Sequence, residues 1–183
     1  MLTPVKSFMS SVNGKYISDK CIDGSTNGPK EDMCHTKSER APWLAISFGE
    51  HNMISVKTVV LFNRNDYTEK PLWARTKNVE IRLANELPTS AEQMFTGGVL
   101  VGSYDGPAGR GEIIEIRSLP EWQKKRGRYL IIQMDMKQKH PLHLKEVFVY
   151  NLNHLKSTGA IELPLHGFYC KEKFVKTCQV SPT

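Results

Sequence analysis

An arginine and an aspartate, Arg64 and Asp66, stand two residues apart just after an apolar run at residues 56–62. The run is typical of a β-strand, so both side chains are expected on a loop at its C-terminal end. A carboxylate this close can orient a guanidinium, and hydrogen bonds from ionised donors are about twice as strong as neutral ones. Such a pair suits the vicinal hydroxyls of a sugar, whose C–H face would stack on an aromatic ring such as Tyr67 or Trp73.

The four cysteines fall in two local pairs near the ends of the chain, Cys21 with Cys34 and Cys170 with Cys178. Four cysteines allow three pairings, and the local one closes short loops at low entropic cost. Zinc binding is the alternative, although there is no C-x-x-C pair and His35 is the only imidazole nearby. Two disulfides would indicate a protein that works outside the cell or in the secretory lumen.

The charge balance is moderately basic, because 25 Lys and Arg against 19 Asp and Glu give a net charge of +6. These charges are spread along the chain, so no nucleic acid partner is implied. The densest cluster lies beside Trp122 and comprises Lys124, Lys125, Arg126 and Arg128. It is either a solvated loop or a place where phosphate, sulfate or an anionic lipid surface is attracted.

Other sequence signals are negative. No apolar run approaches the roughly 20 residues that a membrane-spanning helix needs, so we do not expect the chain to span a membrane. It carries no G-x-S-x-G, H-E-x-x-H, P-loop or dinucleotide motif, and we do not expect an enzyme. His140 and His143 have the spacing of one helix face, but Pro141 argues against a helix and therefore against a metal site there.

The segments that must position these residues are predicted to be strands. Short runs rich in Val, Ile, Phe and Tyr extend from residue 43 to residue 150, and Val79, Ile81 and Leu83 alternate with charged residues as in a half-buried strand. Turn signals separate the runs at spacings that suit antiparallel connections. The pattern predicts a β-sandwich with a short helix at residues 90–95 and strands at residues 43–48, 55–62, 79–83, 99–103, 112–116, 129–134 and 145–150.

The length of 183 residues suits one globular domain with a core large enough to fold without a metal. We assign the sandwich to residues 1–152. Residues 153–183 are more polar, and they are either a tail that packs on the sandwich or the opening of a further module.

Five segments carry a resemblance to a known family. They are SDKCIDG at residues 18–24, APWLAISF at 41–48, VVLFNRND at 59–66, RGRYL at 126–130 and LHLKEV at 142–147. In this order they resemble the fucolectin (F-type lectin) family and its wider relatives, the discoidin or coagulation-factor C-type domains. The resemblance covers residues 5–152 and implies an all-β, eight-stranded antiparallel jelly-roll sandwich of the galactose-binding-like class. In that class, loops at one end hold a ligand, usually a sugar, and often a structural calcium ion.

The resemblance centres the sugar site on Arg64. In the family, a histidine, this arginine and a second Arg or Lys five residues after the aspartate grip fucose together. Here the position five residues after Asp66 is Pro71, and the family's adjacent cysteine pair is absent. The resemblance therefore implies a glycan without fixing which one. The candidate carbohydrate-binding residues are Arg64, Asp66, Lys70, His35 and Tyr67.

The calcium ion that the resemblance implies would bind roughly six to eight oxygen atoms. Asp23 and Glu146 match the family's two carboxylate ligands in position. The rest of the implied shell consists of carbonyl oxygens of Lys20, Ser25 and Lys145 and an oxygen around Asp32. In the alternative, Asp23 only caps its turn and Glu146 is an exposed charge on a strand.

Our leading hypothesis is an extracellular, non-catalytic carbohydrate-binding module, either secreted or part of a larger ectodomain, with its glycan at the loops around Arg64 and a structural calcium. The alternative is a discoidin-type adhesion domain that binds a cell-surface protein or an anionic lipid surface. A third hypothesis is a sandwich that only spaces other modules. Exposed aromatic residues on the loop after Phe62 would favour sugar, whereas exposed apolar residues beside the basic cluster would favour a membrane.

Overall fold

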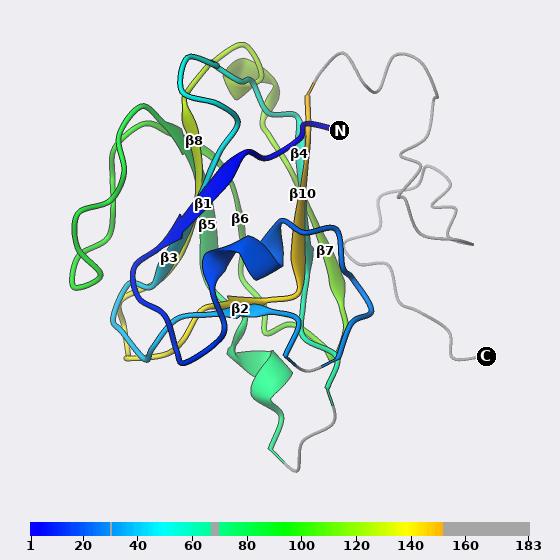
Figure 1. Ribbon diagram of the computed structural model, residues 1–183. Helices are drawn as coiled ribbons and strands as arrows, with labels where there is room; N and C mark the ends of the chain where they lie inside the picture. The colour runs from blue at the N-terminus through cyan, green and yellow to red at the C-terminus, as the bar shows by residue number, and fades with distance from the viewer. Residues whose placement is uncertain (30, 67–69, 152–183) are drawn as a thin grey trace.

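The computed structural model describes residues 1–29, 31–66 and 70–151, and over this part the chain is an antiparallel β-sandwich (Figure 1). One sheet has five strands in the order β1 (Lys6–Met9), β3 (Trp43–Ser47), β8 (Tyr129–Met134), β5 (Val79–Ala84) and β6 (Val99–Tyr104). The facing sheet has three, in the order β10 (Glu146–Tyr150), β4 (Thr58–Phe62) and β7 (Ile113–Arg117). These eight strands confirm the predicted fold class.

A two-stranded ribbon and three short 3-10 helices complete the described part. The ribbon pairs β2 (Cys34–His35) with β9 (His143–Leu144), and the 3-10 helices are η1 (Ser18–Cys21), η2 (Leu72–Arg75) and η3 (Pro120–Trp122). Figure 1 shows η2 and the ribbon at one end of the sandwich and η3 at the other. The two loop clusters that the sequence singled out therefore lie at opposite ends.

The core follows from the alternation of apolar residues. In β5, Val79, Ile81 and Leu83 are buried between the sheets, whereas Glu80 and Arg82 are partly exposed. Such alternation is what a strand with one covered face requires.

Strand β3 is buried on both faces, because a second apolar cluster covers the outer side of the five-stranded sheet. Trp43 belongs to this cluster and is 8% exposed. Phe95 and Leu87 pack against the cluster from outside, which places the segment around residues 87–95 on that face of the sheet.

The short helix predicted at residues 90–95 is wrong. The Glu92 amide donates to Ser90 Oγ at 3.0 Å, a local turn. The Phe95 amide donates to Gln133 Oε1 at 3.1 Å, and Gln133 Nε2 donates to the Phe95 carbonyl at 2.8 Å. Tertiary hydrogen bonds thus use the backbone groups that a helix would need.

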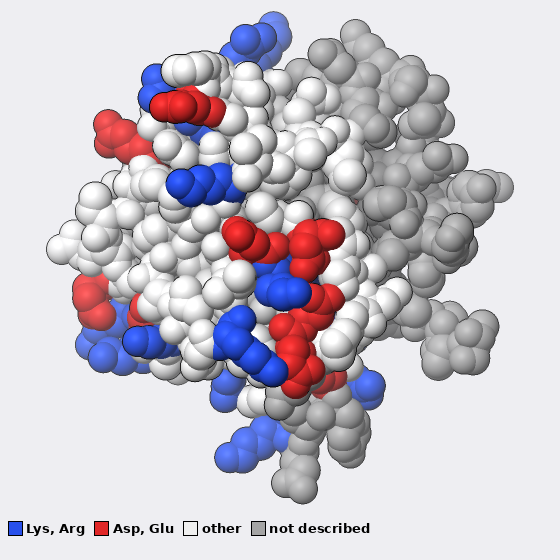
Figure 2. Space-filling view, viewed as in Figure 1, with Lys and Arg blue, Asp and Glu red and all other residues white. Residues whose placement is uncertain are grey.

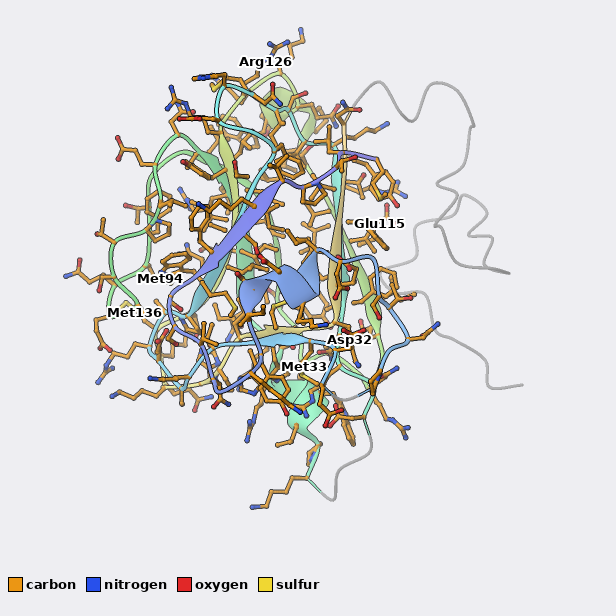
Figure 3. All side chains as sticks on the ribbon, in the orientation of Figure 1. Asp32, Met33, Met94, Glu115, Arg126 and Met136 are labelled. Atoms are coloured by element: carbon orange, nitrogen blue, oxygen red, sulfur yellow. A yellow bond between two sulfur atoms is a disulfide. The ribbon has the colours of Figure 1, made fainter. Side chains whose placement is uncertain are left out.

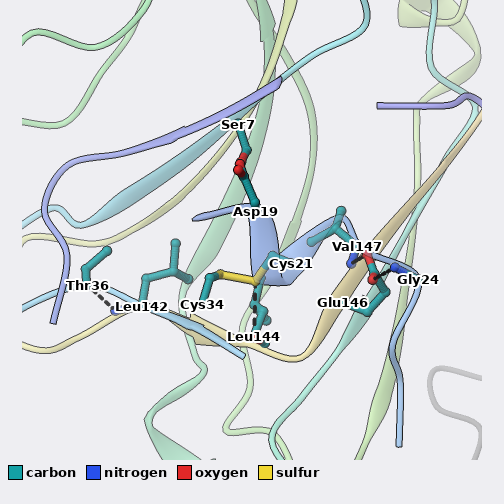
Figure 4. The surroundings of a disulfide bond; sticks show 10 residues. All are labelled: Ser7, Asp19, Cys21, Gly24, Cys34, Thr36, Leu142, Leu144, Glu146 and Val147. Atoms are coloured by element: carbon teal, nitrogen blue, oxygen red, sulfur yellow. Dashed lines mark hydrogen bonds between the residues drawn. A yellow bond between two sulfur atoms is a disulfide. The ribbon is translucent and has the colours of Figure 1, made fainter. Parts of the chain in front are cut away.

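A disulfide joins η1 to the ribbon. Cys21 and Cys34 are bonded, with their Cα atoms 5.3 Å apart, and both are fully buried (Figure 4). The predicted pairing of these two residues is confirmed. Cys170 and Cys178 lie outside the described residues, as does the whole segment 153–183. Among the described residues, no helix has the length and apolar character needed to cross a bilayer.

Candidate functional site

Arg64 and Asp66 form a bidentate ion pair two residues beyond the end of β4. Arg64 Nε donates to Asp66 Oδ1 at 2.7 Å, and Nη2 donates to Oδ2 at 2.6 Å. The guanidinium is only 3% exposed, so the carboxylate both neutralises and orients it. A guanidinium has five N–H donors and Asp66 accepts two of them, which leaves donors for other acceptors.

The loop that carries Arg64 is fixed by the buried side chain of Asn63. Its Nδ2 donates to the carbonyls of Trp73 at 3.0 Å and Gly109 at 2.7 Å, and its Oδ1 accepts from Thr76 Oγ1 at 2.9 Å. The side-chain amide of Asn63 therefore connects the segment after β4 to η2 and to the loop before β7. No sequence motif signals this role, since a buried asparagine is recognised only by its hydrogen-bond partners.

The loop before β7 also contacts the Arg64 segment directly. The Gly111 amide donates to the Arg64 carbonyl at 2.9 Å, and Arg110 Nε donates to the Asn65 carbonyl at 2.8 Å. Gly111 has φ +64°, and a Cβ atom there would lie 3.2 Å from Asn65 Cβ. Glycine therefore permits both the backbone conformation and the close approach. These bonds place the exposed Arg110 beside the candidate site.

Two histidines of the ribbon lie next to this site. His35 and His143 are directly opposite in the β2–β9 pairing, with ring centroids 5.4 Å apart. The Tyr16 ring also contacts His35, in a tilted arrangement with the ring centroids 5.8 Å apart. His143 is fully buried, and within the described part of the chain neither of its ring nitrogens has a hydrogen-bond partner.

The environment keeps both imidazoles neutral at neutral pH. Burial, together with the positive charges of Arg64 and Arg75, lowers the pKa of His143 to about 3. Burial also lowers the pKa of His35, against the opposing effect of its Nδ1 contact with the Thr36 carbonyl at 2.6 Å. The structure therefore gathers a shielded arginine and two neutral histidines at one end of the sandwich.

The remaining residues predicted to bind sugar are Lys70 and Tyr67, and Trp73 was the alternative aromatic residue. Lys70 is exposed on the same loop. Tyr67 lies outside the described residues, so its predicted stacking role stays a prediction. Trp73, the other aromatic candidate, is half-buried on η2. Tyr16 was not predicted, because it lies far from Arg64 in sequence and reaches the site only through the ribbon.

A second group of charged residues surrounds η1 and the loop that follows it. Figure 2 shows acidic and basic side chains interleaved on the face of the molecule that carries η1. Lys20 Nζ lies 3.0 Å from Asp32 Oδ1 and 3.5 Å from Asp23 Oδ2. Asp32 also accepts a short hydrogen bond from Ser25 Oγ. Lys145 is fully buried, and its Nζ donates to the Gly28 carbonyl at 2.7 Å and to the Pro29 carbonyl.

Glu146 faces the same loop from the first residue of β10. It is 1% exposed, so the alternative of an exposed strand charge is wrong. Its Oε2 accepts from the Gly24 amide at 2.5 Å and its Oε1 from the Val147 amide at 2.8 Å (Figure 4). Burial raises the pKa of this carboxyl to about 7. Asp23 Oδ1 accepts from the Ser25 amide at 3.0 Å, as in the turn-capping alternative.

The residues assigned to calcium do not fit that ion as they lie here. Within the described residues, no three His, Cys, Asp or Glu side chains converge closely enough to hold a metal. Instead, Asp23 and Asp32 share the Lys20 ammonium, and the Glu146 carboxylate accepts backbone amides. Calcium binding itself stays a prediction.

Comparisons place this fold among known structures. No family model matches the sequence, and no curated protein matches it either. The lectin domain of lectinolysin, solved with Lewis B antigen, is 23% identical, with a TM-score of 0.60 over 80% of this chain and 92% of that one.

Two further structures are similar. A fucolectin from serum of the striped bass, Morone saxatilis, is 23% identical, with a TM-score of 0.66 over 82% of this chain and 47% of that one. A family 32 carbohydrate-binding module of C. perfringens NanJ, in complex with galactose, is 16% identical, with a TM-score of 0.56 over 80% of this chain and 93% of that one. At such identities the similarity shows the fold alone. It is the galactose-binding-like fold of the fucolectins and related modules, as the resemblance predicted.

Proposed function

We propose that this chain is a non-catalytic, extracellular carbohydrate-binding module that holds a glycan at the loops around Arg64. The observation that carries the proposal is the fixed Arg64–Asp66 pair at the end of β4, at one end of a sandwich. Structures with this fold have been solved with Lewis B antigen and with galactose. The buried disulfide supports an oxidising compartment.

The site has the chemistry that a sugar hydroxyl needs. The N–H groups that Arg64 does not give to Asp66 are charge-assisted donors. The neutral His35 ring, whose Nδ1 donates to the Thr36 carbonyl, offers its Nε2 as an acceptor. Tyr16 and Trp73 are half-buried aromatic residues at this end, each able to cover an apolar sugar face. The carboxylate of Asp66 keeps the guanidinium in one orientation, so little conformational entropy is lost on binding.

The first prediction is that Arg64→Ala weakens glycan binding by about 10- to 100-fold. The reason is that each lost charge-assisted hydrogen bond is worth roughly 1.5 to 3 kcal/mol. The glycan is first identified on a glycan array, and its affinity is then measured by titration calorimetry. Arg117→Ala is the matched control, because Arg117 also pairs with a carboxylate, Glu115 at 2.6 Å, but is 73% exposed on β7. The control should bind as the wild type does.

Truncation of a buried arginine also leaves the Asp66 carboxylate without its partner, so folding must be checked. Arg64→Lys keeps the charge but loses the bidentate geometry, and we expect it to fold and still bind at least tenfold more weakly. Melting curves of both variants separate loss of binding from loss of structure. Unchanged affinity in a folded Arg64 variant would show that the glycan binds elsewhere.

A second candidate function, binding to an anionic lipid surface, is favoured by the opposite end of the sandwich. The side chains of the basic cluster there are exposed, and Arg126 projects from this end (Figure 3). Leu119, which precedes η3, is 52% exposed, and Met53, next to the bridge between Ile54 and Gly127, is 42% exposed. Exposed apolar side chains beside lysines are typical of surfaces that enter a lipid headgroup region.

For this candidate we expect sedimentation with phosphatidylserine vesicles at low salt and none with phosphatidylcholine alone. Lys124→Glu/Lys125→Glu should abolish the binding, since each basic residue near the surface contributes about 1 kcal/mol. Lys15→Glu/Lys37→Glu makes the same charge change at other exposed positions and should have a much smaller effect. Equal sedimentation of all three proteins would exclude a specific role for the basic loop.

A further inference from the structure

The ammonium group of Lys145 lies inside the protein against two backbone carbonyl oxygens, a kind of ligand that metal cations also use. Its side chain is fully buried, and its ammonium donates to the carbonyl oxygens of Gly28 and Pro29. These carbonyls lie more than a hundred residues away in sequence, so the ammonium joins the loop after η1 to the start of β10. Backbone carbonyls that converge on a positive charge are also the oxygens that calcium selects.

Lys20 supplies a second positive charge to the same loop. Its ammonium lies between the carboxylates of Asp32 and Asp23, at 3.0 and 3.5 Å. Ser25 Oγ adds a hydrogen bond to Asp32. The side-chain oxygens that the resemblance assigned to a metal in this loop therefore already have an ionic or hydrogen-bonded partner.

The remaining carboxylate points elsewhere. Both oxygens of Glu146 accept backbone amides, from Gly24 and from its own neighbour Val147. The oxygens of this region consequently do not point to one common centre. The Asp23 and Asp32 carboxylates face the Lys20 ammonium, the two carbonyls face the Lys145 ammonium, and the Glu146 carboxylate faces backbone amides. A divalent ion that used them would have to displace two ammonium groups, because like charges repel strongly at such distances in a partly buried site.

We propose that the ammonium groups of Lys20 and Lys145 take the place of a structural calcium ion, so that this sandwich closes its η1 loop onto β10 without a metal. The loop is held by charges that are part of the chain. Its stability is accordingly independent of the calcium concentration. This inference concerns the fold of the loop and does not depend on whether a glycan binds at Arg64.

The test compares melting temperatures of the full chain in millimolar calcium and in excess chelator. The wild type should melt at the same temperature in both. Lys20→Met leaves Asp23 and Asp32 without their shared cation, and this variant should now gain about 2 to 4 °C with calcium, as expected for a ligand at a hundredfold excess over its Kd. Lys15→Met is the control, since within the described part of the chain the recorded ion pair of Lys15 is a long, exposed one with Glu31 at 3.9 Å. It should stay insensitive.

Two results would overturn the proposal. One is a wild-type melting temperature that rises by a few degrees with calcium, which would show that the ion binds despite the lysines. The other is a folded Lys20→Met protein that calcium does not stabilise, which would show that Lys20 is not what keeps the ion out. Direct titration with calcium, followed by calorimetry, should give no heat for the wild type and a saturable signal for Lys20→Met.

Discussion

His143→Phe is expected to remove a large part of the protein's sensitivity to acid. His143 has a pKa of about 3 in the folded protein against 6.5 in the unfolded chain. Between these values the unfolded state binds a proton that the folded state does not bind, so the free energy of unfolding falls as the pH falls. The loss amounts to about 4 kcal/mol at pH 3 and is nearly absent above pH 6.5.

Phenylalanine cannot be protonated, and neither ring nitrogen of His143 has a partner to lose among the described residues. We therefore propose to measure urea unfolding of both proteins at pH 7 and at pH 4. At pH 7 the wild type and the variant should have similar free energies of unfolding, whereas at pH 4 the variant should be more stable than the wild type by about 3 kcal/mol. His51→Phe, at an exposed position, should leave the wild-type pH profile unchanged. Some acid sensitivity should persist in His143→Phe, because burial also lowers the pKa of His35. Identical pH profiles for wild type and His143→Phe would contradict the burial of this ring.

Removal of the disulfide between Cys21 and Cys34 should destabilise the protein by about 3 kcal/mol. The bond closes a loop with a sequence separation of 13 residues, and a crosslink of this size restricts the unfolded chain by about that free energy. For a domain of this size the expected fall in melting temperature is about 6 to 12 °C. Both residues are fully buried, so Cys21→Ala/Cys34→Ala also leaves a small cavity in the core, which adds to the loss in the same direction.

Calorimetric melting of this double variant gives the measurement. The melting temperature should fall while the far-ultraviolet spectrum stays that of the β-sandwich, because the eight strands of the two sheets pair with one another and not with the loop that the disulfide closes. Peptide mapping under non-reducing conditions should recover Cys21 linked to Cys34 in the wild type. A variant that melts within about 2 °C of the wild type would contradict the stabilising role of the bond.

Much of the fold could be predicted because the strand pattern is strong where one face is covered. The alternation at Val79, Ile81 and Leu83 gave the correct face for β5, since a strand repeats every two residues. The short strands β1, β2 and β9 were missed, because two to four residues carry too little pattern. The helix at residues 90–95 failed for another reason: its backbone groups are taken by Gln133, which is distant in sequence.

The site was harder to predict. The Arg64–Asp66 pair follows from neighbours in sequence, and its geometry is as expected. The contributions of Asn63, Tyr16 and His143 depend on loops brought together from opposite parts of the chain, and no spacing rule shows them. Lys145 was assigned only a carbonyl ligand, because sequence alone does not reveal that its ammonium is buried against Gly28.

Titration of the isotope-labelled protein with a glycan selected on an array, followed by NMR, tests the proposed function most directly. This experiment locates the ligand without any substitution that risks unfolding. We predict saturable chemical-shift changes for the amides of Asn63, Arg64, Arg75 and Gly111 and for those of the β2–β9 ribbon, with the loop at Lys124–Arg128 unaffected. Shift changes confined to that basic loop, or no change with any glycan on the array, would contradict a sugar site at Arg64.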